Sequence, residues 1–247
     1  MNNSSGNVKR NWSAKKILAI VPARGGSKGL PGKNKRLLCG KPLVSYPIIA
    51  AKNSQYISRI ICSTDDLDIA GIARFYGAEV PRLRPESLAK DETSTIDVVI
   101  DILEKDDKDS EVIVVLEPTS PLTTATDIDR GLELLLSSES YPSLISVSEL
   151  ISGHPQFVFN LLPSGRVESV LGDKWEFRRR QELSPLYFQD GSLYMSTRSN
   201  LLRKKSFVSF GSVGLIMPKF KSFEIDDEVD WLILEALLTR LEDLQHE

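Results

Sequence analysis

A doubly wound, mostly parallel α/β sheet is the fold that this 247-residue sequence predicts. Short β-branched apolar runs recur along the chain, and longer amphipathic patterns separate them. The stretch at 111–116 (EVIVVL) is an almost continuous apolar run, as in strands that helices cover on both faces. Because strand–helix–strand crossovers are right-handed, this order predicts one sheet between two layers of helices.

The expected elements alternate along the chain. Strands are expected where β-branched and apolar residues cluster, at 17–21, 59–63, 79–80, 111–116, 144–147 and 213–217. Helices are expected where apolar residues recur at helical spacing, at 42–52, 66–76, 94–104, 127–136 and 227–244. Pro42 suits the first turn of the first helix, and Gly77 is a suitable C-cap for the second. In such a sheet, ligands bind outside the carboxyl ends of the strands.

Length and composition restrict the class of protein. The chain suits one large domain at 17–247, after a polar, Asn- and Ser-rich stretch at 1–16 that we expect to be a disordered leader. A net charge of −3 argues against a broad nucleic-acid-binding surface. Cys39 and Cys62 are too few for a disulfide framework, so free thiols are expected. No apolar run approaches membrane-spanning length, and we expect a cytoplasmic protein.

The stretch at about 150–190 interrupts the alternation of strands and helices. It is rich in proline, glycine and aromatic residues, and it carries the basic cluster at 178–180. Loops of this length without structure are uncommon, and the aromatic residues argue against full solvation. We therefore expect an inserted arm that packs against a second subunit, with a long surface loop as the alternative.

The loop that follows the first strand, 22–34 (PARGGSKGLPGKN), is the strongest candidate for binding an anion. Its glycines let the backbone approach a ligand, its amide N–H groups can cradle phosphate oxygens, and its basic side chains supply charge. The Walker pattern is excluded because Ser27 stands where its first glycine would be and Asn34 follows Lys33. The dinucleotide-binding G-x-G-x-x-G spacing is absent as well. A triphosphate-binding loop of another kind is predicted.

Two further loops follow the carboxyl ends of strands. Thr64 or Asp65 is expected mainly to cap the helix at 66–76, although a contact with ligand stays open. Glu117 ends the most hydrophobic strand, in a loop that two prolines stiffen, and a contact with ligand is favoured over a scaffold role. The two histidines, His154 and His246, are isolated in the sequence, which argues against a catalytic triad or a zinc site.

The segment at 223–227 (FEIDD) precedes the last expected helix. In an extended chain Glu224 and Asp226 point to the same side, because side chains alternate with period two. Two carboxylates on one side suit Mg²⁺, which prefers oxygen ligands and phosphate oxygens. Capping of the helix by Asp226 or Asp227 is the alternative, and the two roles are compatible.

These loops together resemble the acylneuraminate cytidylyltransferases, the CMP-sialic acid synthetases and their bacterial relatives that act on legionaminic and pseudaminic acids. The similarity runs from about 17 to 237. It is carried by IVPARGGSKGLPGKN (20–34), ICSTDD (61–66), LRPESLAKD (83–91), LEPTSPL (116–122), RRQELSP (179–185), DGSLYM (190–195) and EIDDEVD (224–230). The motifs are specific in this order, although none is specific alone.

The resemblance implies a Rossmann-like nucleotidyltransferase that uses CTP, a nonulosonic acid and Mg²⁺. The sugar's anomeric hydroxyl would attack the α-phosphorus of CTP, and pyrophosphate would leave. The implied nucleotide-binding residues are Ala23, Arg24, Gly25, Ser27, Lys28, Lys33, Asn34, Arg84 and Thr95, of which Arg24 and Lys33, together with Asp226, would be catalytic. The implied sugar-binding residues are Glu117, Thr119, Ser120, Arg180, Gln181, Phe188 and Asp190, and the implied metal ligands are Glu224 and Asp226. The arm would form a homodimer and carry Arg180 toward the neighbouring site; whether dimers pair into tetramers stays open.

The chain departs from the family pattern at four places. Family members usually carry glutamine at Glu117, often arginine at Thr123, Arg-x-Asn-Gly at 188–191 and Asp-x-Asp at 224–226. Most of these changes add carboxylates or remove a cation where the sugar is expected. We therefore hypothesise a substrate other than N-acetylneuraminate, with a different N-substituent or a deoxy side chain. An inactive nucleotide-binding homologue and a nucleotidyltransferase for a sugar 1-phosphate are the alternative functions.

Overall fold

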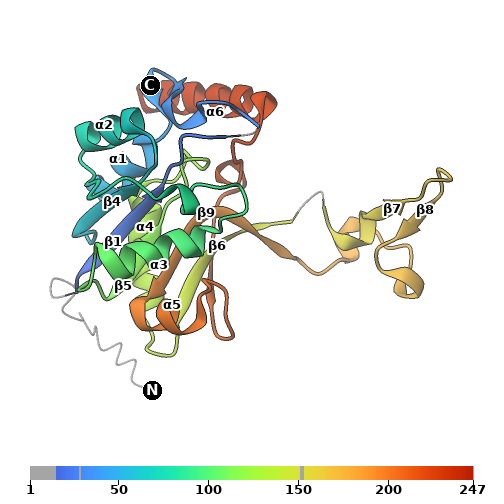
Figure 1. The fold of residues 1–247 in the computed structure, drawn as a ribbon. Coiled ribbons are helices and arrows are strands. Elements are labelled where there is room, and N and C mark those ends of the chain that lie inside the picture. Colours follow the sequence, from blue (N-terminus) through green and yellow to red (C-terminus); the bar gives the residue numbers. More distant parts are fainter. Residues whose placement is uncertain (1–14, 28, 151–152, 247) are drawn as a thin grey trace.

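The computed structural model describes residues 15–27, 29–150 and 153–246, with side chains up to residue 241 (Figure 1). The expected leader at 1–16 and the expected site residue Lys28 therefore lie wholly or largely outside the described residues. Cys39 and Cys62 are free thiols, as predicted. No helix in the described ranges is long and apolar enough to cross a membrane.

A six-stranded mixed sheet with the strand order β10–β6–β9–β5–β1–β4 forms the centre of the molecule. Its strands are β1 (Ile17–Pro22), β4 (Arg59–Ser63), β5 (Val112–Val115), β6 (Ser143–Glu149), β9 (Tyr187–Thr197) and β10 (Val213–Ile216). β1 pairs in parallel with β4 and β5, and β6 pairs in parallel with β10. β9 runs antiparallel between β5 and β6. The predicted mostly parallel α/β sheet is confirmed.

Helices cover both faces of the sheet, because β1 presents alternate apolar residues to each side. Ile17, Ala19 and Val21 of β1 share one core cluster with α1, α2 and α4. Leu18 and Ile20 share a second cluster with α3 and α5. The helices are α1 (Ser45–Asn53), α2 (Leu67–Tyr76), α3 (Thr95–Lys105), α4 (Ala125–Leu136), α5 (Arg198–Lys204) and α6 (Glu228–His246).

A third core cluster joins α6 to the loops above the sheet. Trp231 and Leu234 of α6 are buried against Leu30, Leu38 and Leu43, with Leu122 and Ile225 in the same cluster. Leu30 belongs to the loop after β1, and Ile225 belongs to the segment that precedes α6. The short hairpin of β2 (Leu37–Leu38) and β3 (Lys41–Pro42) completes this region. The cluster holds two of the predicted site loops against the same helix.

Three expectations from the sequence are wrong in detail. No strand was expected in 187–197, yet β9 lies in the middle of the sheet and begins inside the stretch expected to be an arm. Residues 79–80 form no strand; an isolated bridge joins Ile61 and Glu79. The helix cap after β4 is Asp66, whose side chain accepts from the amides of Asp68 and Ile69, rather than Thr64 or Asp65.

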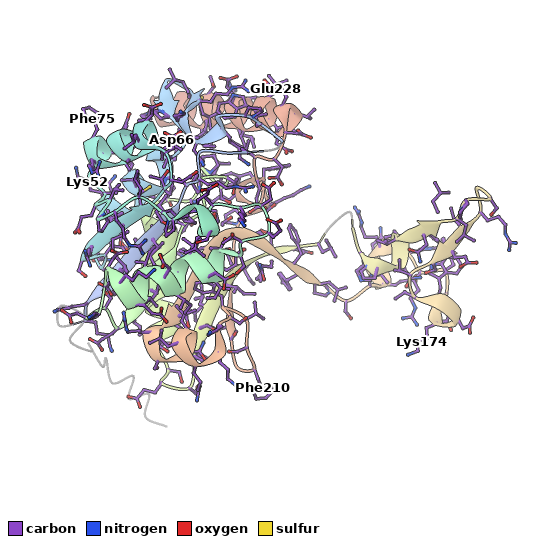
Figure 2. All side chains as sticks on the ribbon, in the orientation of Figure 1. Lys52, Asp66, Phe75, Lys174, Phe210 and Glu228 are labelled. Atoms are coloured by element: carbon purple, nitrogen blue, oxygen red, sulfur yellow. The ribbon has the colours of Figure 1, made fainter. Side chains whose placement is uncertain are left out.

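Residues 153–186, here called the arm, extend away from the sheet between β6 and β9 (Figure 1). They contain the hairpin of β7 (Phe159–Leu161) and β8 (Val167–Ser169) and three single-turn 3₁₀ helices. The indole N–H of Trp175 donates to the carbonyl of Gln156 at 3.0 Å, and its ring meets Phe159 edge-on at 6.0 Å. Figure 2 shows the arm's side chains, Lys174 among them, standing clear of the body of the molecule.

Candidate active site

Loops from the carboxyl ends of β1, β4 and β5 meet at one edge of the sheet. The loop after β1, residues 22–34, is here called the phosphate loop. Its first residue beyond the strand, Ala23, is fully buried and donates its amide to the carbonyl of Ser63 at the end of β4. The amide of Leu116 likewise donates to Ile20 of β1. These bonds bring three polar loops to the place where a sheet of this kind binds ligands.

Hydrogen bonds from neighbouring loops fix the phosphate loop. The amide of Gly25 donates to Asp65 Oδ1 at 2.8 Å, so Asp65 supports this loop instead of capping α2. Asn34 Nδ2 donates to the carbonyl of Arg24 at 2.9 Å. A Cβ at Gly25 would lie 2.9 Å from the Cβ of Asp66, closer than such atoms come, so the close approach of these loops requires glycine. Ser27 is partly exposed on the loop.

The phosphate loop also touches the segment at 223–227, here called the carboxylate segment. Lys33 Nζ donates to the carbonyl oxygen of Ile225 at 2.5 Å and lies 3.6 Å from Asp226 Oδ1. The Lys33 side chain is only 11% exposed, whereas that of Asp226 is 81% exposed. A Cβ at Gly29 would lie 2.3 Å from the carbonyl oxygen of Asp226. The main cation of the loop therefore sits beside the predicted metal ligands.

Glu224 lies deeper in the carboxylate segment than Asp226. Its Oε1 accepts from Ser120 Oγ at 3.4 Å, and a Cβ at Gly191 would lie 1.6 Å from the same oxygen. Gly191 has φ of 74°, so both its backbone and the carboxylate beside it require glycine. Burial, and then the charges of Asp226 and Asp190, raise the pKa of Glu224 to about 7. Such mutual repulsion of carboxylates suits a site that receives a cation.

The donor set fits a hard divalent cation, because both Glu224 and Asp226 offer carboxylate oxygens. Asp227 has a different role: its Oδ1 accepts from the amides of Val229 and Asp230 and caps α6. The described residues contain no cluster of three or more His, Cys, Asp or Glu side chains arranged around one metal position. Further ligands of a metal here would come from phosphate oxygens and water, as is usual for Mg²⁺.

Two cavities near the carboxyl ends of these strands share two residues, and the first of them adjoins the phosphate loop through Pro22 and Arg24. The first, of about 220 Å³, is lined by Arg24, Arg84, Lys90, Thr95 and Glu117 among others. The second, of about 260 Å³, is lined by Thr95, Glu117, Gln189, Tyr194, Lys205 and Phe207 among others. Thr95 Oγ1, at the start of α3, donates to Glu117 Oε1 at 3.1 Å. The bonded pair forms the boundary between the two cavities.

Two charged side chains of these cavities have perturbed pKa values. Burial, opposed in part by the bond from Thr95, raises the pKa of Glu117 to about 7, and the charge of Glu224 adds to the rise. Arg84 is buried, donates to Ser63 Oγ at 3.0 Å and to the Ser63 carbonyl at 2.6 Å, and burial lowers its pKa. On the first cavity's rim, Arg24 Nη1 contacts Asp91 Oδ1 at 2.6 Å. Cationic and carboxylate groups thus face the same space.

The structure places the expected sugar-binding residues unevenly. Thr119 and Ser120 lie against the carboxylate segment, where the Thr119 carbonyl accepts from the amide of Ile225. Asp190 is 2% exposed, accepts from Ser146 Oγ and Ser148 Oγ within the sheet, and lies outside the linings of both cavities. Phe188 of β9 pairs with Ser148 of β6, close to where the arm leaves the sheet. Arg180 and Gln181 are exposed on the arm. Thr123 is buried and bonded to the carbonyl of Ser192.

Several residues of the second cavity had not been expected from the sequence. Gln189 and Tyr194 lie on β9, and Gln189 Nε2 donates to the Tyr194 hydroxyl at 3.0 Å. Lys205 follows α5 in a left-handed conformation with φ of 48°, and Phe207 packs against Tyr194 at 5.5 Å. The sequence of β9, YFQDGSLYMST, has no regular alternation of polar and apolar residues that would have marked it as a strand and drawn attention to Gln189 and Tyr194.

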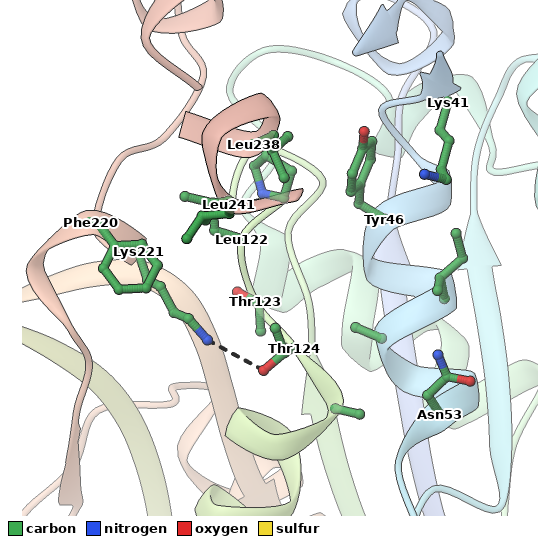
Figure 3. Close-up of a pocket in the computed structure, with 14 residues that line it drawn as sticks. Lys41, Tyr46, Asn53, Leu122, Thr123, Thr124, Phe220, Lys221, Leu238 and Leu241 are labelled. Atoms are coloured by element: carbon green, nitrogen blue, oxygen red, sulfur yellow. Dashed lines mark hydrogen bonds between the residues drawn. The ribbon is translucent and has the colours of Figure 1, made fainter. Parts of the chain in front are cut away.

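A third cavity, of about 530 Å³ and larger than these two, lies elsewhere (Figure 3). α1, α6, residues 121–125 and residues 220–221 line it, and no described residue of the phosphate loop does. Its walls are largely apolar, with Tyr46, Leu122, Leu238 and Leu241 drawn around the opening. Lys221 crosses one side of it to reach Thr124. This cavity shares no lining residue with the two cavities that meet at Thr95 and Glu117.

Relatives and solved structures agree with this architecture. A CMP-N,N'-diacetyllegionaminic acid synthase of Legionella pneumophila is 37% identical over 90% of this chain and 96% of its own length. An N-acylneuraminate cytidylyltransferase of Escherichia coli is 34% identical over 87% of this chain, which spans half of that protein. A CMP:2-keto-3-deoxy-manno-octonic acid synthetase complexed with CTP has a TM-score of 0.68 at 15% identity, covering 92% of this chain and 99% of that one, and therefore shares the fold. The profile of the family described as Cytidylyltransferase matches residues 18–224, and the chain belongs to that family.

Proposed function

We propose that this protein transfers CMP from CTP to the anomeric hydroxyl of a nonulosonic acid and releases pyrophosphate, with Mg²⁺ as its metal. One observation carries the proposal: the phosphate loop and the carboxylate segment are joined through Lys33, beside two cavities that share Thr95 and Glu117. Two neighbouring cavities can hold a nucleotide and an acceptor next to each other, which is the requirement for in-line transfer. The named relatives act on acceptors of this class.

The first cavity is the proposed nucleotide site. Arg84, fixed by its bonds to Ser63, presents a guanidinium to the nucleotide, and Arg24 and the loop amides face its phosphates. Lys33 neutralises charge that develops on the phosphates during transfer. Glu224 and Asp226 hold the metal, which supplies further neutralisation of phosphate charge when bound. Arg84, Lys33 and Glu224 are already oriented by hydrogen bonds within the protein.

The second cavity is the proposed site of the sugar acid. Glu117 and Gln189 offer acceptors and donors to hydroxyl or amide groups, whereas Phe207 and Tyr194 offer an apolar surface. Since Asp190 lies within the sheet, the hypothesis that the substrate differs from N-acetylneuraminate now depends mainly on Glu117. A carboxylate where relatives of the resembled family carry an amide favours a substrate that donates a hydrogen bond there.

A homodimer formed through the arm completes the proposal. Leu161, Val167 and Phe177 on the arm are 75%, 62% and 80% exposed, more apolar surface than a separate segment keeps in water without a partner. Arg180 and Gln181 lie on the same arm, and a second copy of the chain would bring them to a neighbouring sugar site. The cytoplasmic location expected from the sequence stays a prediction.

The test is pyrophosphate release from CTP and Mg²⁺ with a panel of acids: N-acetylneuraminate, legionaminate, pseudaminate and a deaminated analogue. We expect release with one or more acids and less with N-acetylneuraminate than with the preferred acid. Equal turnover of all acids would contradict the substrate hypothesis alone. CTP binding without release for any acid would contradict the proposed reaction and favour an inactive homologue.

A further inference from the structure

A buried ion pair lies outside the two cavities that share Thr95 and Glu117. Lys221 Nζ contacts Asp127 Oδ2, and the two side chains are only 12% and 4% exposed. Lys221 Nζ also donates to Thr124 Oγ1 at 3.3 Å (Figure 3). Asp127 belongs to the first turn of α4, where its Oδ2 accepts from the Thr124 amide at 2.9 Å. The ammonium is therefore attached to the start of a helix that packs into the main core.

The position of Lys221 in the sequence links this pair to the carboxylate segment. Lys221 ends the short 3₁₀ helix η7 (Lys219–Lys221), three residues before Glu224. The Lys221 carbonyl accepts from Ser192 Oγ at 3.2 Å. Downstream, the Ile225 amide donates to Thr119 at 2.9 Å, and the Ile225 carbonyl accepts from Lys33. Glu224 is thus held between an upstream anchor at Lys221 and a downstream anchor at Ile225.

The surroundings of Lys221 make the upstream anchor necessary. Lys221 and its neighbour Phe220 line the cavity of about 530 Å³, so close packing does not confine this stretch on that side. Without the pair, space is available into which the backbone before Glu224 can move. A buried ion pair adds little net stability. Asp127 is also contacted by Arg130 Nη1 at 3.9 Å and by the Thr124 amide and hydroxyl, so it is a fixed point to which the Lys221 ammonium is attached. The role of the Lys221–Asp127 pair is therefore to fix the position of the backbone before Glu224.

We propose that Lys221 is a positioning residue: through Asp127 it holds the carboxylate segment where Glu224 and Asp226 can bind a divalent cation together with CTP. This inference rests on the proposed function, because it concerns the metal of the same site. Lys221 touches neither substrate cavity, so its effect passes through the backbone to Glu224. The residues whose position it fixes, Glu224 and Asp226, are the two that fit a hard cation.

Binding of Mn²⁺ in the presence of CTP, followed by the electron paramagnetic resonance of free Mn²⁺, tests the inference without turnover. We expect Lys221→Met to weaken Mn²⁺ binding about tenfold and Lys221→Arg, which keeps the cation, to restore most of it. Asp127→Asn should weaken Mn²⁺ binding by a similar factor. The variant that carries both Lys221→Met and Asp127→Asn should bind Mn²⁺ no more weakly than Lys221→Met alone, because the two substitutions break the same ion pair. Arg198→Met is the matched control.

Arg198 pairs with Asp107 at 3.1 Å with side chains 19% and 4% exposed, and its amide bonds to Glu111 at the other end of β5. Arg198→Met should lower the Tm as much as Lys221→Met does, but it should leave Mn²⁺ binding unchanged. Mn²⁺ binding by Lys221→Met equal to that of the wild type, or equally weakened by Arg198→Met, would overturn the inference. If Glu224→Gln together with Asp226→Asn leaves Mn²⁺ binding unchanged, the proposed metal site itself fails, and the inference with it.

Discussion

The edge of the sheet and the arm differ in how far the chain itself fixes their side chains. At the sheet edge, Lys33, Arg84 and Glu117 each have a hydrogen-bond partner that is distant in the sequence. On the arm, Arg180 and Gln181 are exposed, and large apolar side chains such as Phe177 stand in water. The comparison suggests that the nucleotide half of the site is formed within one chain, whereas the arm's contribution depends on a second copy.

The largest effect is expected from Lys33→Met. It removes the ammonium that we propose neutralises the phosphates, and it removes the bond that joins the phosphate loop to Ile225. By analogy with the loss of one group that stabilises a transition state, kcat/KM should fall by roughly 10³-fold. Steady-state pyrophosphate release measures this. Lys35→Met is the control, because Lys35 pairs with Asp66 and Asp68 instead and should change kcat/KM only a few-fold.

Gly191→Ala tests how rigidly the sheet edge is built. The new methyl group would overlap Glu224 Oε1, and alanine is strained at φ of 74°. We expect roughly 100-fold lower activity and a lower Tm, since the carboxylate must move from its place. Gly165→Ala in the arm is the matched control: φ is 79° there, but nothing lies within 4 Å of the new methyl group. Equal losses of activity in both variants would show that strain, not the carboxylate, is responsible.

Phe177→Lys tests whether the arm acts through a second copy of the chain. Because Phe177 is 80% exposed, a lysine there should leave the fold of one chain intact while opposing burial against a second copy. Light scattering should report a monomer, and the KM for the sugar acid should rise by about tenfold, as for the loss of a charged contact. CTP affinity should stay within twofold. A monomeric variant with full activity would contradict a role for the partner's arm.

Glu117→Gln should give the smallest effect, and its direction depends on pH. The pKa of Glu117 in the folded protein, about 7, lies above its ordinary value of 4.5. The unfolded chain therefore releases its proton first, and the ionised group lowers stability as pH rises from about 4.5 to 7. The glutamine variant should match the wild type in Tm near pH 4.5 and exceed it by a few degrees at pH 8. A constant difference across that range would contradict the raised pKa.

The sequence predicts those parts of the site that follow directly from a local pattern. The phosphate loop, Glu117 and Asp227 each come at the end of an apolar run or before a helix, and the structure puts them where that pattern indicates. Asp66 caps α2 in place of the expected Thr64 or Asp65, because the choice between adjacent acceptors depends on the phosphate loop, whose Gly25 amide Asp65 accepts. Such contacts between loops have no local signature.

The second cavity could not be predicted for a related reason. β9 combines aromatic, polar and small residues and reaches the sheet only after the arm, so its place between β5 and β6 depends on pairing across long separations. Its Asp190 is a residue type that often contacts ligands, but here it is buried. It accepts hydrogen bonds from the hydroxyls of Ser146 and Ser148 and from the amide of Ser192. Lys205 lies in the same cavity only because α5 folds back beside β9.

Phosphorus NMR of the purified protein with CTP, Mg²⁺ and each sugar acid tests the central claim most directly. The account predicts that the three CTP signals are replaced by those of pyrophosphate and of one new phosphodiester, in equal amounts, and only when a suitable acid is present. CTP that stays intact with every acid, although it binds, or hydrolysis to free CMP without a phosphodiester, would contradict it.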